Sequence, residues 1–110
     1  MAMLEMFIFE EKLGKIMDLD LKGRRALVCG SSQGIGLAIA KELSKMNVNI
    51  TLFARNQKSL EHALSELQPG DHDFLVADFD DLNAVEEATK RGLEKGDYQI
   101  LINNSGGPAP

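Results

Sequence analysis

Short apolar runs alternate with longer segments of helical hydrophobic spacing over most of this 110-residue chain. The apolar runs have the length of buried strands, and they cover residues 25–29, 48–54, 74–77 and 98–102. Each interval between them places apolar residues three or four positions apart, which is the spacing of one helix face. The pattern therefore predicts four strands separated by three helices, in the order βαβαβαβ.

Residues with known preferences for helix ends mark the three predicted helices. Asn47 is a suitable C-cap for the first helix, and Asn56 is a suitable N-cap for the second. Asp80 or Asp81 would cap the start of the third helix, and Gly96 would close it. The side chains expected to face the sheet are Ile35, Ile39, Leu43 and Met46 in the first helix, Leu60, Ala63, Leu64 and Leu67 in the second, and Leu82, Val85, Ala88 or Thr89, and Leu93 in the third.

Polar features gather where the predicted strands end. Strands joined through helices form a parallel sheet with right-handed crossovers, so their carboxyl ends meet at one edge. Residues 30–36, Arg55, Asp78 and Asn103-Asn104 each follow one of the four strands. Parallel α/β sheets bind ligands outside these carboxyl ends. The convergence of four polar segments indicates a binding site more strongly than any one of them.

The most distinctive segment is the turn Gly30-Ser31-Ser32-Gln33-Gly34-Ile35-Gly36, called the glycine turn below. It lies between a strand and a helix, where unpaired backbone N–H groups and the helix dipole favour a phosphate group. Glycine permits the close approach of a pyrophosphate and a left-handed backbone without strain. The alternative is a turn whose glycines serve packing alone. Ser32 and Gln33 would add neutral hydrogen bonds to a bound ligand.

Arg55 indicates which dinucleotide the turn would bind. It lies 19 residues after Gly36, at the end of the second strand, and residues 48–54 contain no Asp or Glu. An acidic residue there would bind the ribose 2′-OH of NAD(H), whereas a cation accommodates the 2′-phosphate of NADP(H). The sequence therefore favours NADP(H) over NAD(H). The alternative is an arginine that is merely solvated in a loop.

The other polar residues have both a functional and a structural interpretation. Asp78 would accept a hydrogen bond from the adenine amine, or act as a loop or cap carboxylate. Asn103-Asn104 would join loop backbones, or simply end a strand. Cys29 is expected to be a small buried residue rather than a reactive thiol. No other potential metal ligand lies at a suitable spacing from His62 or His72. We therefore expect no metal site and a structural or solvated role for both histidines.

Composition argues against several classes of protein, including nucleic-acid-binding, disulfide-bonded and membrane-spanning proteins. The chain has 12 basic and 17 acidic residues, and its net charge of −5 argues against a nucleic-acid-binding surface. One cysteine excludes an internal disulfide and suits the reducing cytoplasm. No apolar run approaches the roughly 18 residues that indicate a membrane span, so we expect none.

Residues 1–18 stand apart from the domain expected at residues 19–110. Their apolar residues would form one helical stripe of their own. We expect either an extension that merely precedes the domain proper, or an arm that packs on a partner or on a sheet edge.

The glycine turn, Arg55, Asp78-Phe79 and Asn103-Asn104-Ser105-Gly106 together resemble the short-chain dehydrogenase/reductase family. The resemblance covers about residues 19–107, and residues 103–108 are similar to the 3-oxoacyl-carrier-protein reductases of bacteria. It implies an α/β fold, a Rossmann-type doubly wound parallel sheet with strand order 3-2-1-4. It also implies that residues 19–110 are the N-terminal part of a dinucleotide-binding domain, truncated relative to the whole fold.

The resemblance implies a cofactor-binding role for matching positions. These are Gly30, Ser32, Gln33, Gly34, Ile35, Gly36, Arg55, Asp78, Phe79, Asn104, Ser105 and Gly106. The glycine turn would hold the pyrophosphate and adenosine end, Arg55 the 2′-phosphate, Asp78 and Phe79 the adenine, and Asn104 to Gly106 the ribose region. Two positions depart from the family pattern, because Cys29 replaces a usual Thr and Ser105 a usual Ala.

Catalysis in the family uses a Ser, a further Asn and a Tyr-x-x-x-Lys pair, none of which this chain matches. Its only tyrosine, Tyr98, is followed four residues later by Ile102. We therefore assign no catalytic residue and expect no turnover from these 110 residues, a carbonyl or alcohol substrate being handled only by a longer chain. One hypothesis is the cofactor-binding half of an NADP-dependent oxidoreductase. The alternative is a catalytically inactive nucleotide-binding or assembly module.

The fourth predicted strand indicates that the chain pairs with a partner. Residues 98–102 would form a sheet edge with one apolar face uncovered. Such an edge favours pairing with another strand, so we expect self-association or a partner chain there.

Overall fold

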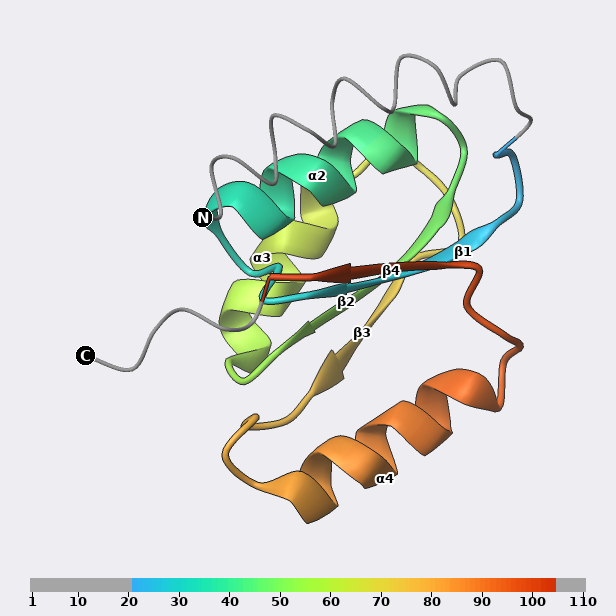
Figure 1. The fold of residues 1–110 in the computed structure, drawn as a ribbon. Coiled ribbons are helices and arrows are strands. Elements are labelled where there is room, and N and C mark those ends of the chain that lie inside the picture. Colours follow the sequence, from blue (N-terminus) through green and yellow to red (C-terminus); the bar gives the residue numbers. More distant parts are fainter. Residues whose placement is uncertain (1–20, 105–110) are drawn as a thin grey trace.

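The computed structural model describes residues 21–104, which form one parallel four-stranded sheet with helices on both faces (Figure 1). The strand order is β3-β2-β1-β4, which confirms the predicted doubly wound α/β topology. In chain order the elements are β1 (Arg25–Cys29), α2 (Gly34–Lys45), β2 (Asn49–Ala54), α3 (Gln57–Ser65), β3 (Asp73–Val76), α4 (Leu82–Leu93) and β4 (Ile100–Asn103).

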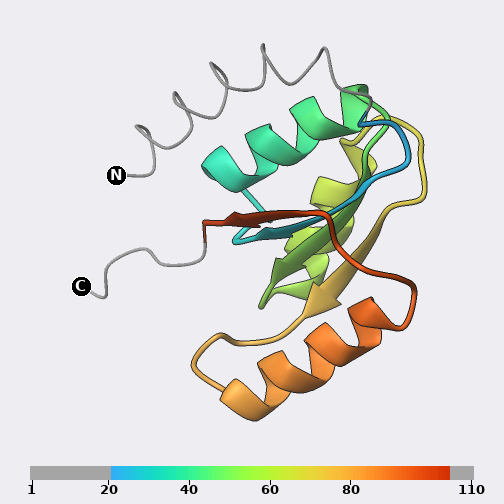
Figure 2. The same cartoon turned by 45° about the vertical axis from the view of Figure 1, so that its right-hand side comes forward.

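Two apolar clusters hold the three layers together. α2 and α3 cover one face of the sheet, and α4 lies on the other, as the turned view in Figure 2 shows. The buried residues of the first cluster are Ala26, Val28, Ile39, Ala40, Leu43, Val48, Ile50, Leu52, Ala54, Leu60, Ala63 and Leu67. Those of the second are Leu27, Cys29, Phe53, Leu75, Ala77 and Ala88. Successive residues of β1 and β2 alternate between the clusters, because side chains of a strand point to opposite faces in turn.

The strand register aligns the carboxyl ends of the sheet. Cys29, the last residue of β1, pairs with Phe53 of β2 and with Asn103 of β4. On the other side of β2, Ala54 pairs with Val76 at the end of β3. The segments that follow all four strands therefore start at one edge, as the sequence predicted.

Two helices start at predicted capping residues, whereas the C-caps of α2 and α4 are Met46 and Glu94 and not the predicted Asn47 and Gly96. The Asn56 side chain accepts a hydrogen bond from the Ser59 N–H at 2.9 Å, and the Asp81 side chain accepts one from the Ala84 N–H at 3.1 Å. Asp81, and not Asp80, is therefore the N-cap of α4. Asn47 comes one residue after the Met46 C-cap with φ of 63°, the left-handed conformation that Asn tolerates after a helix end.

Two predicted features of the C-terminal half are wrong. Leu82 and Leu93 do not face the sheet, because their exposed fractions are 78% and 46%. α4 packs instead through Ala88 and Gly92, whose small size lets the helix lie close to the sheet. The fourth strand is also shifted: it begins at Ile100, so Tyr98 precedes the strand and Asn103 belongs to it.

A polar network anchors α4 at the opposite, amino edge of the sheet. The Arg25 guanidinium donates hydrogen bonds to the carbonyls of Gly96 and, at 3.2 Å, Gly92. It also lies 4.3 Å from the centroid of the Tyr98 ring. The Tyr98 hydroxyl donates to Thr51 Oγ1 at 3.1 Å, and Thr51 in turn donates to Asp73 at 2.6 Å.

Tyr98, the only tyrosine of the chain, therefore has a structural role. It lies beside the start of β1, whereas the glycine turn follows the end of that strand.

His72 has a structural role as well. Its Nδ1 accepts a hydrogen bond from the buried Ile50 N–H at 2.9 Å, and its Nε2 lies 2.7 Å from the Gln68 carbonyl oxygen. This arrangement fits a neutral ring that carries its proton on Nε2.

The proposed N-terminal extension, residues 1–18, lies outside the described residues, as do the predicted ribose-region residues Ser105 and Gly106. Among residues 21–104, no helix has the length and apolar character needed to cross a membrane.

Candidate functional site

The glycine turn leaves β1 and enters α2, and its three glycines meet two different requirements. Gly30 and Gly34 have φ of 69° and 64°, in the left-handed region that favours glycine. Gly36 lies in the first turn of α2, where an added Cβ would stand 2.4 Å from the Gly30 carbonyl oxygen. Glycine at these positions is therefore required by the fold of the turn itself, in addition to any ligand.

The amino end of α2 is open to a ligand. Gln33 precedes the helix in an extended conformation, and its side chain makes no capping hydrogen bond. By contrast, side chains of Asn56 and Asp81 cap α3 and α4. The first N–H groups of α2 thus lack a side-chain acceptor and keep the positive end of the helix dipole, which suits an anionic group.

Hydrogen bonds fasten the glycine turn to β2. The Gly30 N–H donates to the Phe53 carbonyl at 2.8 Å, and the Phe53 N–H donates to Ser31 Oγ at 3.0 Å. Ser31 is fully buried, so this bond satisfies a polar side chain that solvent cannot reach. Ser31 lies within the glycine turn but is not among the predicted cofactor-binding residues. Its role depends on the pairing of β1 with β2, which the sequence does not display.

The other strand ends reach the same edge. The Ala77 N–H donates to the Ala54 carbonyl at 3.0 Å, and the Asn104 N–H donates to the Cys29 carbonyl at 3.2 Å. Asp78 is exposed, and its Oδ1 accepts a hydrogen bond from the Asp80 N–H at 2.9 Å within the loop before α4. This bond matches the loop interpretation of Asp78 and leaves its second carboxylate oxygen for a ligand.

Arg55 follows β2 directly and is exposed. It forms no hydrogen bond or ion pair with any other residue from 21 to 104. An unpaired guanidinium at this edge adds positive charge beside the glycine turn, because β2 neighbours β1.

Two of the predicted cofactor-binding residues, Phe79 and Ile35, are engaged in packing, as is Cys29 before the glycine turn. The Phe79 ring contacts Phe53, with ring centroids 4.9 Å apart at an interplanar angle of 45°. Ile35 packs against the cluster beneath α2 and α3. Cys29 is 8% exposed, and burial raises the pKa of its thiol. The thiol is therefore protonated at neutral pH, which supports the structural interpretation of Cys29.

A groove of about 480 Å³ opens beside the glycine turn, between α2 and α3. It is lined by Ser32, Gln33, Gly34, Leu37, Lys58, Ser59, His62 and Glu66. The α3 residues on this surface were not predicted as site residues. Their spacing was a usable signal, because Lys58, His62 and Glu66 recur every four positions and so share one helix face.

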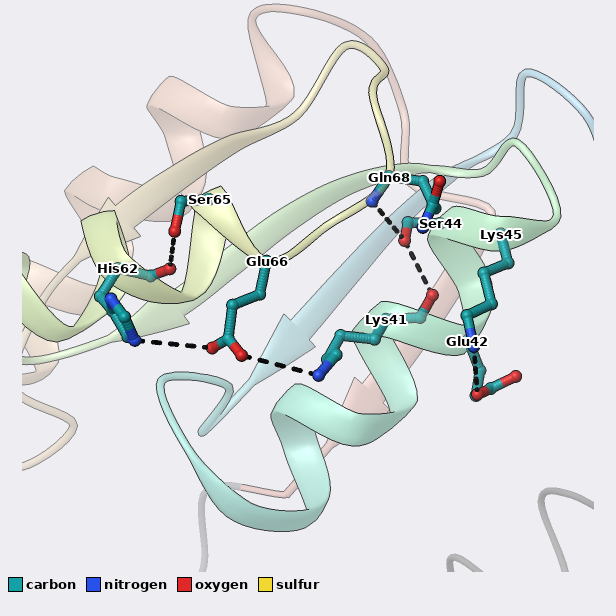
Figure 3. Close-up of polar contacts among 8 residues, drawn as sticks. All are labelled: Lys41, Glu42, Ser44, Lys45, His62, Ser65, Glu66 and Gln68. Carbon is teal, nitrogen blue, oxygen red and sulfur yellow. Dashed lines mark hydrogen bonds and ion pairs between the residues drawn. The ribbon is translucent and has the colours of Figure 1, made fainter.

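Polar contacts occupy the end of the groove at Glu66. Figure 3 shows the Glu66 carboxylate between the Lys41 ammonium group of α2 and the His62 ring of α3. Lys41 Nζ of α2 lies 3.6 Å from Glu66 Oε1, and His62 Nε2 lies 3.9 Å from Glu66 Oε2. The Lys41 pair links α2 to α3 at the surface and offsets the one negative charge that lines the groove.

The part of the chain from residue 21 to 104 contains no cluster of three His, Cys, Asp or Glu residues able to hold a metal ion.

Comparison with known proteins agrees with this geometry. The family model described as short chain dehydrogenase matches residues 24–110. The chain belongs to the short-chain dehydrogenase/reductase family, whose members are NAD(P)-dependent oxidoreductases.

Among relatives, hydroxysteroid dehydrogenase-like protein 1 of Gallus gallus is 38% identical over 108 residues, covering 96% of this chain and 33% of the relative. Inactive hydroxysteroid dehydrogenase-like protein 1 of Homo sapiens is 34% identical over 102 residues, covering 89% of this chain and 31% of the relative. Proteins named as 3-oxoacyl or ketoacyl reductases also match, in agreement with the predicted similarity.

Solved structures show the same fold. The L-sorbose reductase from Gluconobacter frateurii, complexed with NADPH and L-sorbose, superposes with a TM-score of 0.75 at 30% identity. The match covers 83% of this chain and 37% of the reductase. The chain thus spans about a third of the length of the curated relatives it matches.

Proposed function

We propose that this chain is the NADP(H)-binding part of an oxidoreductase that transfers hydride to a carbonyl or from an alcohol. The observation that carries the proposal is the glycine turn, which leads into the amino end of α2 at the edge where all four strands end. No side chain caps the N–H groups at this end of the helix. A bound nicotinamide cofactor would supply the hydride chemistry. The residues of this chain would bind and orient the cofactor.

Each predicted residue then has a defined task. The N–H groups at the start of α2 would bind the pyrophosphate, which can approach because Gly30 and Gly34 carry no Cβ. Arg55 would meet the 2′-phosphate, and the free oxygen of Asp78 would accept from the adenine amine. Asn104, whose backbone is tied to Cys29, would border the ribose region together with Ser105 and Gly106.

The preference for NADP(H) rests on charge at the end of β2. Arg55 is exposed and unpaired among residues 21–104, and β2 offers no carboxylate for a ribose 2′-OH. The similarity to an L-sorbose reductase that is complexed with NADPH supports the same preference.

A second candidate function is a nucleotide-binding or assembly module without catalysis. The human relative is named an inactive hydroxysteroid dehydrogenase-like protein, which favours this candidate. In this chain Tyr98 is held in the network at the amino edge, and the residue four positions later is Ile102. Turnover of NADPH with a carbonyl substrate by the purified chain would exclude this candidate.

Two further parts of the proposal concern partners and location. β4 is an edge strand whose Leu101 is 66% exposed, so we propose that it pairs with another strand, from a second copy or a partner. We also propose a cytoplasmic location, which the single unpaired cysteine, Cys29, suits.

Titration with reduced dinucleotides, followed by fluorescence, tests the proposed function. NADPH should bind at least about tenfold more tightly than NADH, which corresponds to about 1.4 kcal/mol. Arg55→Asp should weaken NADPH binding on the order of 100-fold, because it replaces an attractive charge by a repulsive one. Arg91→Asp, with the same charge change on α4, should leave both affinities unchanged. Equal affinities for the two nucleotides in the unmodified chain would contradict the NADP(H) preference.

A further inference from the structure

The His72 ring bridges the amino end of β2 and the segment that follows α3. Its Nδ1 accepts a hydrogen bond from the Ile50 N–H at 2.9 Å, and its Nε2 lies 2.7 Å from the Gln68 carbonyl oxygen. The pairing of β3 with β2 begins only at Asp73 and Thr51. The ring therefore supplies the acceptor for a β2 N–H that lies before the paired part of β3. These two contacts of the ring are called the His72 clasp below.

The backbone around the His72 clasp connects it with both layers. The Gln68 N–H donates to Ser44 Oγ of α2 at 3.1 Å, a contact that Figure 3 shows. Gly70 lies against the ring, because an added Cβ there would stand 2.8 Å from Nε2 of His72. Gln68 therefore links the ring to α2, and Ile50 links it to the sheet.

The His72 clasp requires a neutral ring. A neutral imidazole has one donor and one acceptor nitrogen, whereas a protonated imidazole has two donors. Protonation at Nδ1 would therefore place an N–H against the Ile50 N–H. Because Ile50 is fully buried, its N–H would then lack an acceptor in a place that water does not reach, which is costly.

No carboxylate holds a protonated ring in place. β2 carries no charged residue. The charged residues of the other surrounding segments are Glu66 at the end of α3, Asp71 and Asp73 beside His72 in the chain, Lys95 after α4, and Lys41, Glu42 and Lys45 of α2. Lysines already pair with Glu66, Asp73 and Glu42. Within residues 21–104, none of the carboxylates forms an ion pair with the His72 ring.

We propose that the His72 clasp is a pH-sensitive switch, which frees the connection between α3 and β3 from β2 when the ring gains a proton. In the opened state both ring nitrogens can donate to water, so the opened state binds the proton and the closed state does not. The clasp is therefore closed at neutral pH, and its stability is lost as the pH falls. Linkage favours opening by about tenfold for each pH unit below about 6.5, where an imidazole in water gains its proton. The switch lies at the amino end of β2 and is independent of the proposed nucleotide site.

Amide hydrogen exchange of the full chain, measured by NMR at about pH 7.5 and about pH 5.5, tests this switch. After correction for the intrinsic exchange rate, the protection factor of the Ile50 N–H should be about tenfold lower at the acidic pH. In His72→Asn the side-chain oxygen can accept from Ile50 but does not titrate, so the protection factor should change by less than about twofold. His62→Asn is the matched control, because the His62 side chain is 80% exposed, and it should keep the tenfold change.

Three results would overturn the proposal. The first is an Ile50 protection factor in the unmodified chain that is the same at both pH values. The second is a tenfold change that persists in His72→Asn, because another group would then cause it. The third is a His72 ring whose nitrogen NMR signals show it protonated at the acidic pH while the Ile50 N–H stays protected. This last measurement uses the unmodified chain, so it decides the question even if His72→Asn does not fold.

Discussion

Replacing Gly36 with alanine should abolish dinucleotide binding and lower the free energy of unfolding. The new Cβ would lie 2.4 Å from the Gly30 carbonyl oxygen, 3.0 Å from its carbon and 3.1 Å from Ser31 Cα. All three atoms belong to backbone that is fixed against β2, because the Gly30 N–H donates to the Phe53 carbonyl and Ser31 Oγ accepts from the Phe53 N–H. The turn must therefore move away from α2, at a cost of about 1–3 kcal/mol for overpacking. That movement displaces the N–H groups that would hold the pyrophosphate.

Gly23→Ala is the control for this change. Gly23 has φ of 80° and no atom within 4 Å of an added Cβ, and it precedes β1, far from the carboxyl edge. Alanine there costs about 1–2 kcal/mol of backbone strain without a clash. Urea unfolding should therefore show both variants destabilised, whereas NADPH titration should show lost binding only for Gly36→Ala. Retained binding in Gly36→Ala would mean that the turn does not hold the nucleotide.

Arg25→Met should give the second large effect, a loss of about 2–3 kcal/mol in the free energy of unfolding. The guanidinium donates to carbonyls of Gly92 and Gly96 at the end of α4 and stacks on the Tyr98 ring. Methionine can fill the space but donates no hydrogen bond. Both carbonyls would then lose a charged donor, and the end of α4 would lose its link to β1.

Arg24→Met is the matched control, since Arg24 is exposed and its side chain makes no contact of this kind within residues 21–104. Urea unfolding should show little change for Arg24→Met. Nucleotide affinity of the folded protein should stay the same in both variants, because the network lies at the amino edge. Equal stability of the two variants would show that the Arg25 network does not anchor α4.

Much of the fold could be predicted from local sequence signals. The alternation of apolar runs and helical spacing predicted the parallel sheet, and Asn56 and Asp81 cap helices as their residue types suggest. The prediction for α4 failed in part because periodicity favours large apolar side chains. Leu82 and Leu93 are large, but the helix packs through Ala88 and Gly92, and Tyr98 and Leu75 occupy the space that a larger side chain at Gly92 would need.

The candidate site likewise contains residues that local sequence signals predict and residues that they do not. The glycine turn, Arg55 and Asp78 were predictable because each follows a strand, and strand ends of a parallel sheet share one edge. Ser31 and Lys58 were not, because their environments depend on tertiary contacts. Ser31 matters through a hydrogen bond to Phe53, 22 residues away, and Lys58 through the packing of α3 beside the glycine turn. Local pattern identifies neither contact.

The most direct test of nucleotide binding at the carboxyl edge is an amide NMR spectrum of the chain recorded with increasing NADPH. The backbone signals of the glycine turn, Arg55 and Lys58 should shift first and most, and those of Tyr98 and Lys95 at the amino edge should stay in place. Unchanged signals in the glycine turn at saturating NADPH, or shifts confined to the amino edge, would contradict a dinucleotide site at the carboxyl ends of the strands.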